Sequence, residues 1–170
     1  MEKKQQVYVM CGIPGSGKST LARDYLDWGA VIICRDDFRS MLNGGEYVYK
    51  EELEPTIKVM AEYTLKVALS HGFDVVFDET HHTVHRRMET ISVIRCVQPN
   101  AFITAIVFDP ADVEGCIARR IYDSKGLVPE TWDGIIRKFA DSFEDVTAEE
   151  GFDIVHHIQK PNLAEDFLVV

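Results

Sequence analysis

The segment MCGIPGSGKST, residues 10–20, decides the fold class of this chain. Its residues 12–19 match the pattern G-x-x-x-x-G-K-[ST] in full, after an apolar strand-like run and before a helical pattern. Glycines let backbone N–H groups turn inward around phosphates, and the start of the following helix adds its positive dipole end. We therefore predict a nucleotide-binding phosphate loop made of Gly12, Pro14, Gly15, Ser16, Gly17, Lys18, Ser19 and Thr20.

The residues around this loop predict an α/β fold. Apolar β-type runs alternate with helical patterns, which is typical of βαβ units and indicates a three-layer P-loop fold with five mainly parallel strands. The expected strands cover 6–11, 30–35, 73–79, 102–108 and 152–158, and the expected helices cover 18–28, 55–71, 83–97, 112–121 and 129–143. The polar segment between the last two helices predicts a helical lid over about residues 115–130, with a plain connector as the alternative.

Length and composition limit the functions that are open. The 170 residues suit one domain, residues 1–170, and 46% hydrophobic with 27% charged residues is typical of a soluble globular protein. A net charge of −10 argues against broad coating of a nucleic-acid backbone, so any nucleic-acid contact must be a small site. We expect a cytoplasmic protein of a bacterium or a phage-infected host, with no membrane partner, because no apolar run nears the roughly 20 residues of a membrane span. The oligomeric state stays open.

The phosphate loop and the end of the third strand predict an ATP·Mg²⁺ site. Lys18 would neutralise the β- and γ-phosphates, and Ser19 would help to ligate Mg²⁺. An apolar strand tolerates an acid only where it emerges from the sheet, so Asp78 is the expected second magnesium ligand, with Glu79 next.

The second strand ends in ICRDDFRS, residues 33–40. A hydroxyl that attacks a γ-phosphate needs a carboxylate to accept its proton and cations to hold an anionic acceptor. Asp36 or Asp37 would be that base, and Arg35 and Arg39 would hold the acceptor. The alternative is a solvated helix N-terminus, with the acids on the helix dipole.

The segments GIPGSGKST, CRDDFR and DETHHTVHRR together resemble the 5′-hydroxyl kinase domain of bacteriophage-type polynucleotide kinases. They are also similar to the wider group of small P-loop kinases that includes zeta-toxin-like and antibiotic-modifying enzymes. The resemblance covers most of residues 7–140. It implies that Asp36 is the general base towards a 5′-hydroxyl and that Arg39 contacts the phosphate next to the acceptor nucleoside. It also implies acceptor-side contacts by Thr80, Arg86 and Arg87.

Two positions depart from the family pattern. His81 stands where the family usually has asparagine, and the lid position of the catalytic arginine falls on Asp123. Arg119 and Arg120, one turn earlier, are therefore the predicted groups that stabilise the transferred phosphoryl. The nearby histidines do not predict a zinc site, because adjacent histidines on a turn diverge and no cysteine completes a tetrahedral set.

We therefore expect an ATP-dependent kinase that acts on the 5′-hydroxyl end of DNA or RNA, where Tyr47 and Tyr49 would stack on an acceptor base or only anchor their loop. One alternative is a kinase of the same fold that acts on another hydroxyl: a small metabolite, an antibiotic, a nucleotide-sugar or a modified DNA base. The acidic net charge favours this alternative and the RDDFR element disfavours it. A second alternative, of another class, is a nucleotide-dependent binding or switch module.

Overall fold

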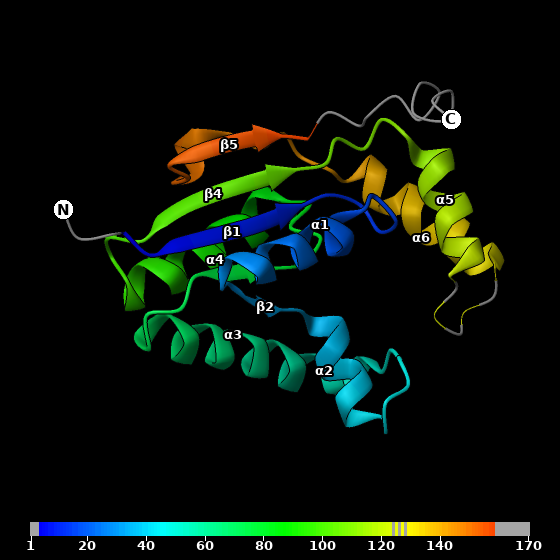
Figure 1. Ribbon diagram of the computed structural model, residues 1–170. Coiled ribbons are helices and arrows are strands. Elements are labelled where there is room, and N and C mark those ends of the chain that lie inside the picture. The colour runs from blue at the N-terminus through cyan, green and yellow to red at the C-terminus, as the bar shows by residue number, and fades with distance from the viewer. Residues whose placement is uncertain (1–3, 124, 126, 128, 159–170) are drawn as a thin grey trace, which may run out of the picture.

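A parallel β-sheet forms the centre of the molecule (Figure 1). The structure is a computed structural model and describes residues 4–158 except 124, 126 and 128. In that part of the chain the sheet has five strands in the order β2-β3-β1-β4-β5, and every pairing is parallel, as predicted. The strands are β1 Gln6–Cys11, β2 Val31–Ile33, β3 Val75–Phe77, β4 Phe102–Val107 and β5 Ile154–His157.

Helices cover both faces of the sheet and give the predicted three layers. The helices are α1 Lys18–Asp24, α2 Arg35–Leu42, α3 Glu54–Ser70, α4 Val84–Val97, α5 Val113–Tyr122 and α6 Pro129–Asp141, with 3₁₀ turns η1 Tyr25–Trp28, η2 Glu51–Leu53 and η3 Ala148–Glu150. Alternate residues of β1 point to opposite faces. Val7 and Val9 pack with α3 and α4, whereas Met10 packs with α1 and η1.

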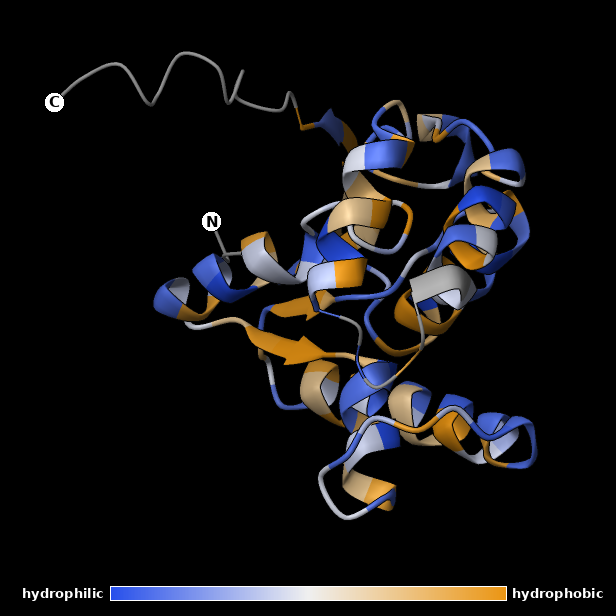
Figure 2. Cartoon of the chain, turned by 90° about the vertical axis from the view of Figure 1, so that its right-hand side faces the viewer, coloured by the Kyte–Doolittle hydropathy of each residue, from blue (hydrophilic) through white to orange (hydrophobic). Residues whose placement is uncertain are grey.

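Hydrophobic residues concentrate in the strands, as Figure 2 shows. The strands are apolar almost throughout because helices cover both of their faces. Among the described residues, no helix combines the length and the hydrophobicity that crossing a membrane requires.

Two local predictions need correction. The helix expected over 18–28 ends at Asp24 and continues as the 3₁₀ turn η1, which stops at Gly29 with φ of 84°. The segment after β2 is itself a helix, α2, with Asp36 and Asp37 in its first turn. The segment therefore does form the helix N-terminus that we gave as the alternative. Because this N-terminus lies beside the phosphate loop, it is compatible with an active site.

The pair α5 and α6 lies beyond the carboxyl ends of the strands (Figure 1). Cys116 and Ile117 of α5 pack with Ile13 of the phosphate loop and with Trp132 and Ile136 of α6. The first part of the predicted lid thus packs directly on the nucleotide loop. The lid itself stays a prediction, and its residues 124, 126 and 128 lie outside the described residues.

Candidate active site

The residues that follow β1, β2 and β3 meet at one edge of the sheet. The Gly12 amide donates to the Thr80 carbonyl at 2.8 Å, and the Asp78 amide donates to the Ile33 carbonyl at 2.9 Å. Ligands of open α/β sheets bind at this carboxyl edge. The phosphate loop, the start of α2 and the end of β3 therefore form one candidate site.

The phosphate loop is held open by glycines and by α5. Gly15 and Gly17 have φ of 80° and 102°, in the left-handed region that favours glycine. A Cβ on Gly15 would lie 2.5 Å from the Cys116 carbonyl oxygen, so α5 leaves no room for a side chain there. Lys18 is buried, and its Nζ donates to the Ile13 carbonyl at 2.8 Å. Burial lowers the Lys18 pKa to about 8, and an anion beside the ammonium would compensate that desolvation.

The side chains of Ser19 and Asp78 are in contact at the end of the phosphate loop. The Ser19 side chain hydrogen-bonds the carboxylate of Asp78, which is 5% exposed. Burial raises the Asp78 pKa, and Ser19 and Lys18 oppose that rise. A hydroxyl and a buried carboxylate are the oxygen donors that Mg²⁺ prefers, and a cation would offset the cost of burying the charge. The donor set therefore fits a magnesium ion.

Glu79 faces a different partner. It forms a close ion pair with Arg35, and both side chains are largely buried. Burial raises the Glu79 pKa, and the Arg35 guanidinium opposes that rise. The ion pair joins the start of α2 to the end of β3. Arg35 can therefore bind an acceptor only with the N–H groups that do not bond Glu79.

Two cations hold the carboxylate of Asp36. Arg39 Nη1 lies 2.6 Å from Asp36 Oδ1, and Lys125 Nζ lies 2.6 Å from Oδ2. Burial raises the Asp36 pKa, but the charges of Lys125, Arg39 and Arg120 outweigh it and hold the pKa below its ordinary value. Asp36 is thus ionised at neutral pH, as a general base must be. Sequence reasoning missed Lys125, which comes from the connection between α5 and α6.

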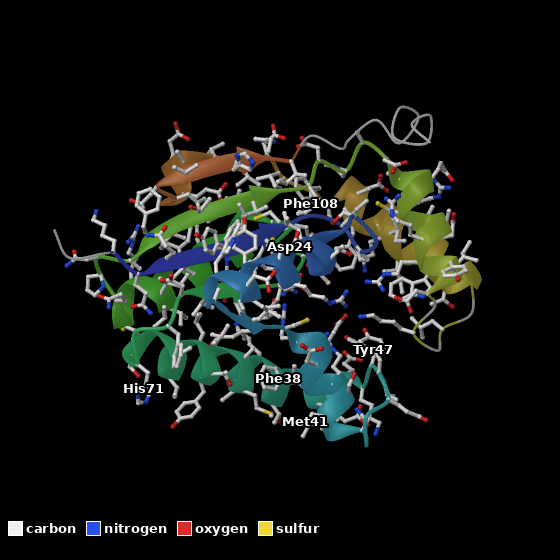
Figure 3. All side chains as sticks on the ribbon, in the orientation of Figure 1. Asp24, Phe38, Met41, Tyr47, His71 and Phe108 are labelled. Carbon is white, nitrogen blue, oxygen red and sulfur yellow. The ribbon has the colours of Figure 1, made fainter. Side chains whose placement is uncertain are left out.

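Glu54 holds the guanidinium of Arg39. Arg39 Nε and Nη2 lie 2.7 and 2.6 Å from the two Glu54 carboxylate oxygens. With the bond to Asp36, three of the five N–H groups of Arg39 are used, and two remain for an acceptor phosphate. The rings of Tyr47 and Tyr49 lie 6.0 and 5.9 Å from the guanidinium carbon. Figure 3 shows Tyr47 between α2 and the connection that follows α5.

Arg119 and Arg120 occupy different positions. Arg119 Nε donates to the Gly15 carbonyl at 2.7 Å, so this side chain ties α5 to the phosphate loop. The Arg120 guanidinium lies 5.1 Å from the Trp132 ring, and its charge lowers the pKa of both Lys18 and Asp36. Among the described residues, the Arg120 Nε is a buried donor without a hydrogen-bond partner. Of the two arginines, Arg120 is therefore the one whose charge acts on both Lys18 and Asp36, whereas Arg119 is bonded to the phosphate loop.

The structure corrects the role that the resemblance implied for Arg87. Its side chain is fully buried, and its five N–H groups are all used. They donate to both carboxylate oxygens of Glu150 and to the carbonyls of His81, Glu144 and Asp145. No donor of Arg87 is left for a substrate, so its role is structural. The neighbouring Arg86 is exposed.

His81 connects β1 to α4 beneath the site. Its Nδ1 lies 2.9 Å from the Met10 carbonyl oxygen, and its Nε2 lies 3.1 Å from the Thr90 hydroxyl. Burial lowers the His81 pKa to about 3, so the ring is neutral. A neutral imidazole offers one N–H donor and one acceptor nitrogen, and an asparagine amide likewise combines N–H donors with an acceptor oxygen. The preceding Thr80 is half-buried, and its hydroxyl lies 3.4 Å from His82 Nδ1.

Comparison with known proteins gives a family and several relatives. Residues 7–140 match the model of the family AAA_33, described as an AAA domain. A protein of Acanthamoeba polyphaga mimivirus, assigned as a bifunctional polynucleotide phosphatase/kinase, is 26% identical over 158 residues. Those residues are 92% of this chain and 34% of the viral protein.

Two solved structures have similar folds. A chain of the Pnkp1/Rnl/Hen1 RNA repair complex has a TM-score of 0.67 at 26% identity, over 84% of this chain and 45% of that one. A fungal RNA kinase has a TM-score of 0.61 at 17% identity, over 92% of this chain and 38% of that one, and shares the fold alone. The predicted P-loop kinase fold is confirmed. The chain spans about a third of the viral relative and less than half of the repair-complex chain.

Proposed function

The chain belongs to the AAA_33 family of AAA domains, and on that premise we propose that it is a kinase that transfers the γ-phosphate of ATP to the 5′-hydroxyl end of a polynucleotide. One observation carries the proposal: the ionised carboxylate of Asp36 lies at the carboxyl edge of the sheet with Arg39 bound to one of its oxygens. A carboxylate with a neighbouring guanidinium suits a hydroxyl acceptor that carries a phosphate.

The phosphate loop and Lys18 would hold the β- and γ-phosphates of ATP. Ser19 and Asp78 would hold Mg²⁺, which when bound supplies positive charge against the phosphate oxygens. Arg120, whose charge acts on both Lys18 and Asp36, would stabilise the charge that spreads over the phosphoryl group during transfer.

Asp36 would take the proton of the acceptor hydroxyl. The hydroxyl oxygen then bonds to the γ-phosphorus while the bond from that phosphorus to the β–γ bridging oxygen breaks, and ADP leaves with the electron pair. The two unused N–H groups of Arg39 would bind the phosphate on the 3′ side of the acceptor nucleoside. Exposed Arg86 and half-buried Thr80 remain proposed acceptor contacts.

The names of the relatives support a polynucleotide acceptor, and identity of 26% to both the viral phosphatase/kinase and the RNA repair chain supports a shared acceptor chemistry. The test is transfer from γ-labelled ATP to single-stranded DNA and RNA oligonucleotides. Those with a 5′-hydroxyl should be labelled, and matched oligonucleotides with a 5′-phosphate should not. The proposal fails if no 5′-hydroxyl oligonucleotide is labelled at any salt concentration tried.

A second acceptor class is favoured by one feature of the groove beside Asp36. The carboxylates of Asp37 and Glu46 line this groove together with Asp36, and Lys125 is the cation that lines it. An acidic groove suits an uncharged or cationic small hydroxyl compound better than a polyanion. Label that enters such compounds in a mixed acceptor panel, and never an oligonucleotide, would establish this second function.

A further inference from the structure

Lys125 reaches the candidate general base from the connection between α5 and α6. Its Nζ lies 2.6 Å from Asp36 Oδ2 and 5.1 Å from the ring centroid of Tyr47. The side chains of Lys125 and Asp36 are 25% and 33% exposed, so this ion pair is partly shielded from water. The backbone φ of Lys125 is 48°, in the left-handed region that non-glycine residues seldom adopt.

We propose that Lys125 is a positioning residue that, together with Arg39, fixes the orientation of the Asp36 carboxylate for proton transfer. The inference rests on the proposed function of Asp36 as the general base. The geometry is complementary, since Arg39 bonds Oδ1 and Lys125 bonds Oδ2. Each oxygen of a carboxylate accepts about two hydrogen bonds, so an acceptor hydroxyl still has a lone pair to use.

Two bonds on opposite oxygens restrict a torsion that is otherwise free. The terminal torsion of an aspartate side chain is broad, so one bond alone leaves the carboxylate plane loosely defined. Charge-assisted bonds of 2.6 Å to both oxygens define that plane. Arg39 is in turn fixed by both oxygens of Glu54, and the Tyr47 ring lies against both cations. The base is thus held by a connected set of side chains from α2, the loop after it, α3 and the α5–α6 connection.

The charges that face Asp36 come from several elements. The cations are Lys125, Arg39 of α2, Arg120 of α5 and Lys18 of α1, and the other titratable groups are Asp78 after β3, Tyr47 and Cys34. Among the cations, Lys125 lowers the Asp36 pKa most. Removing it takes away the largest of these lowering charges, and three cations remain, so we expect the Asp36 pKa to rise but to stay that of an ionised carboxylate at neutral pH.

The experiment compares Lys125→Met and Lys125→Arg with the wild type, and uses Lys138→Met on α6 as the matched surface control. The kcat and KM are measured over pH 3–9 with a 5′-hydroxyl oligonucleotide, because the acid limb of a carboxylate with a lowered pKa lies below pH 5. For Lys125→Met we expect kcat to fall roughly 10- to 100-fold, KM for ATP to stay within about twofold, and the acid limb of kcat/KM to move to higher pH. Lys125→Arg should restore most of the rate, and Lys138→Met should match the wild type.

Two kinetic outcomes overturn the inference. One is a Lys125→Met enzyme with a reduced kcat and an unmoved pH profile, which indicates a structural role. The other is an increased acceptor KM with unchanged kcat, which indicates that Lys125 binds the acceptor. Carboxyl ¹³C NMR titration of Asp36, assigned with Asp36→Asn, gives a readout that needs no acceptor. Failure to label any oligonucleotide would defeat the proposed function, whereas an Asp36 pKa that is equal in wild type and Lys125→Met would defeat this inference.

Discussion

Arg87 and Glu150 form a buried ion pair with two hydrogen bonds. Arg87 Nε lies 2.6 Å from Glu150 Oε2, and Arg87 Nη2 lies 3.0 Å from Oε1. In Arg87→Met, three carbonyls of the surrounding chain would lose their partner, and the Glu150 carboxylate would lose its ion pair and keep the Thr147 amide as a donor. Removing one member of a buried pair costs about 3–5 kcal/mol, so we expect a loss of that size in the free energy of unfolding, measured by urea denaturation.

Arg86 supplies the adjacent control. Its side chain is exposed, so Arg86→Met should change the free energy of unfolding by less than about 0.5 kcal/mol. If Arg86 binds the acceptor, the same variant should raise the acceptor KM. An Arg87→Met protein that unfolds like the wild type but no longer binds an acceptor would restore the acceptor contact that the resemblance implied.

His81 should be replaceable by asparagine but not by leucine. The Met10 carbonyl can only accept, so Nδ1 must carry the ring proton and Nε2 must accept from the Thr90 hydroxyl. An asparagine amide can supply both bonds. His81→Leu leaves the buried carbonyl and hydroxyl unpaired, which costs about 1–3 kcal/mol, whereas His81→Asn should lie closer to the wild type in urea denaturation.

The same histidine should make stability depend on pH. Burial lowers its pKa from 6.5 to about 3 in the folded protein, so below pH 6.5 the unfolded chain binds a proton that the folded chain does not. The stability that neutral His81 contributes is therefore complete above about pH 6.5 and is lost progressively as the pH falls towards 3. Between about pH 7.5 and 5, we expect the wild type to lose about 2 kcal/mol more than His81→Asn. Equal losses in the two proteins would contradict this.

Much of the fold could be predicted because its signals are local. Each strand is a short apolar run, and glycines such as Gly72 follow helix ends, so element types and order follow from neighbouring residues. Where a predicted strand end was imprecise, the strand was predicted too long by one or two residues at that end. The reason lies after β2 and β3, where the backbone leaves the sheet and places Arg35 and Asp78 at the site. The hydrophobicity of the sequence does not show at which residue the chain leaves the sheet.

The site was predictable where a motif is contiguous and not where partners are distant. Ser19 and Asp78 come together because the carboxyl ends of parallel strands share an edge. Lys125 is 89 residues from Asp36, and Glu150 is 63 residues from Arg87, so no periodicity in the sequence relates them. The sequence also does not distinguish the roles of the adjacent Arg86 and Arg87, because the two side chains differ only in their burial in the folded protein.

Gly15→Ala should disable the phosphate loop. A Cβ there would lie 2.5 Å from the Cys116 carbonyl oxygen, at a φ of 80°. Gly29 is a matched control, because its φ is 84° and a Cβ there would meet nothing within 4 Å. Gly29→Ala should cost only the backbone strain, about 1–2 kcal/mol. Gly15→Ala should cost more than this. Because the added methyl group would displace the phosphate loop, we also expect ATP binding, measured by calorimetry, to weaken at least about tenfold. Equal effects of the two variants would show that α5 yields to the added methyl group.

The magnesium requirement should depend on Asp78. Loss of its charge in Asp78→Asn should raise the Mg²⁺ concentration for half-maximal transfer by about 10- to 100-fold. Glu79→Gln is the neighbouring control. Glu79 pairs with Arg35, so its substitution should leave the Mg²⁺ dependence within about threefold. An Mg²⁺ titration that shifts for Glu79→Gln and not for Asp78→Asn would reverse the assignment of the ligand.

Asp36 and Asp37 are neighbours in the first turn of α2, and only one of them should be essential. Asp36 carries the bonds to Arg39 and Lys125, whereas Asp37 is exposed on the adjacent groove. Because the asparagine amide cannot take a proton from the acceptor, Asp36→Asn should lower kcat about 10²- to 10⁴-fold. Its affinity for ATP should stay near that of the wild type, since Lys18 and the loop bind the phosphates.

Asp37→Asn should keep kcat within about threefold, as expected for an exposed side chain that removes no proton. Single-turnover transfer to a 5′-hydroxyl oligonucleotide, with ATP binding measured separately, tests both variants. Equal loss of transfer in the two would mean that the charge of the α2 N-terminus, rather than a single base, is what the reaction needs.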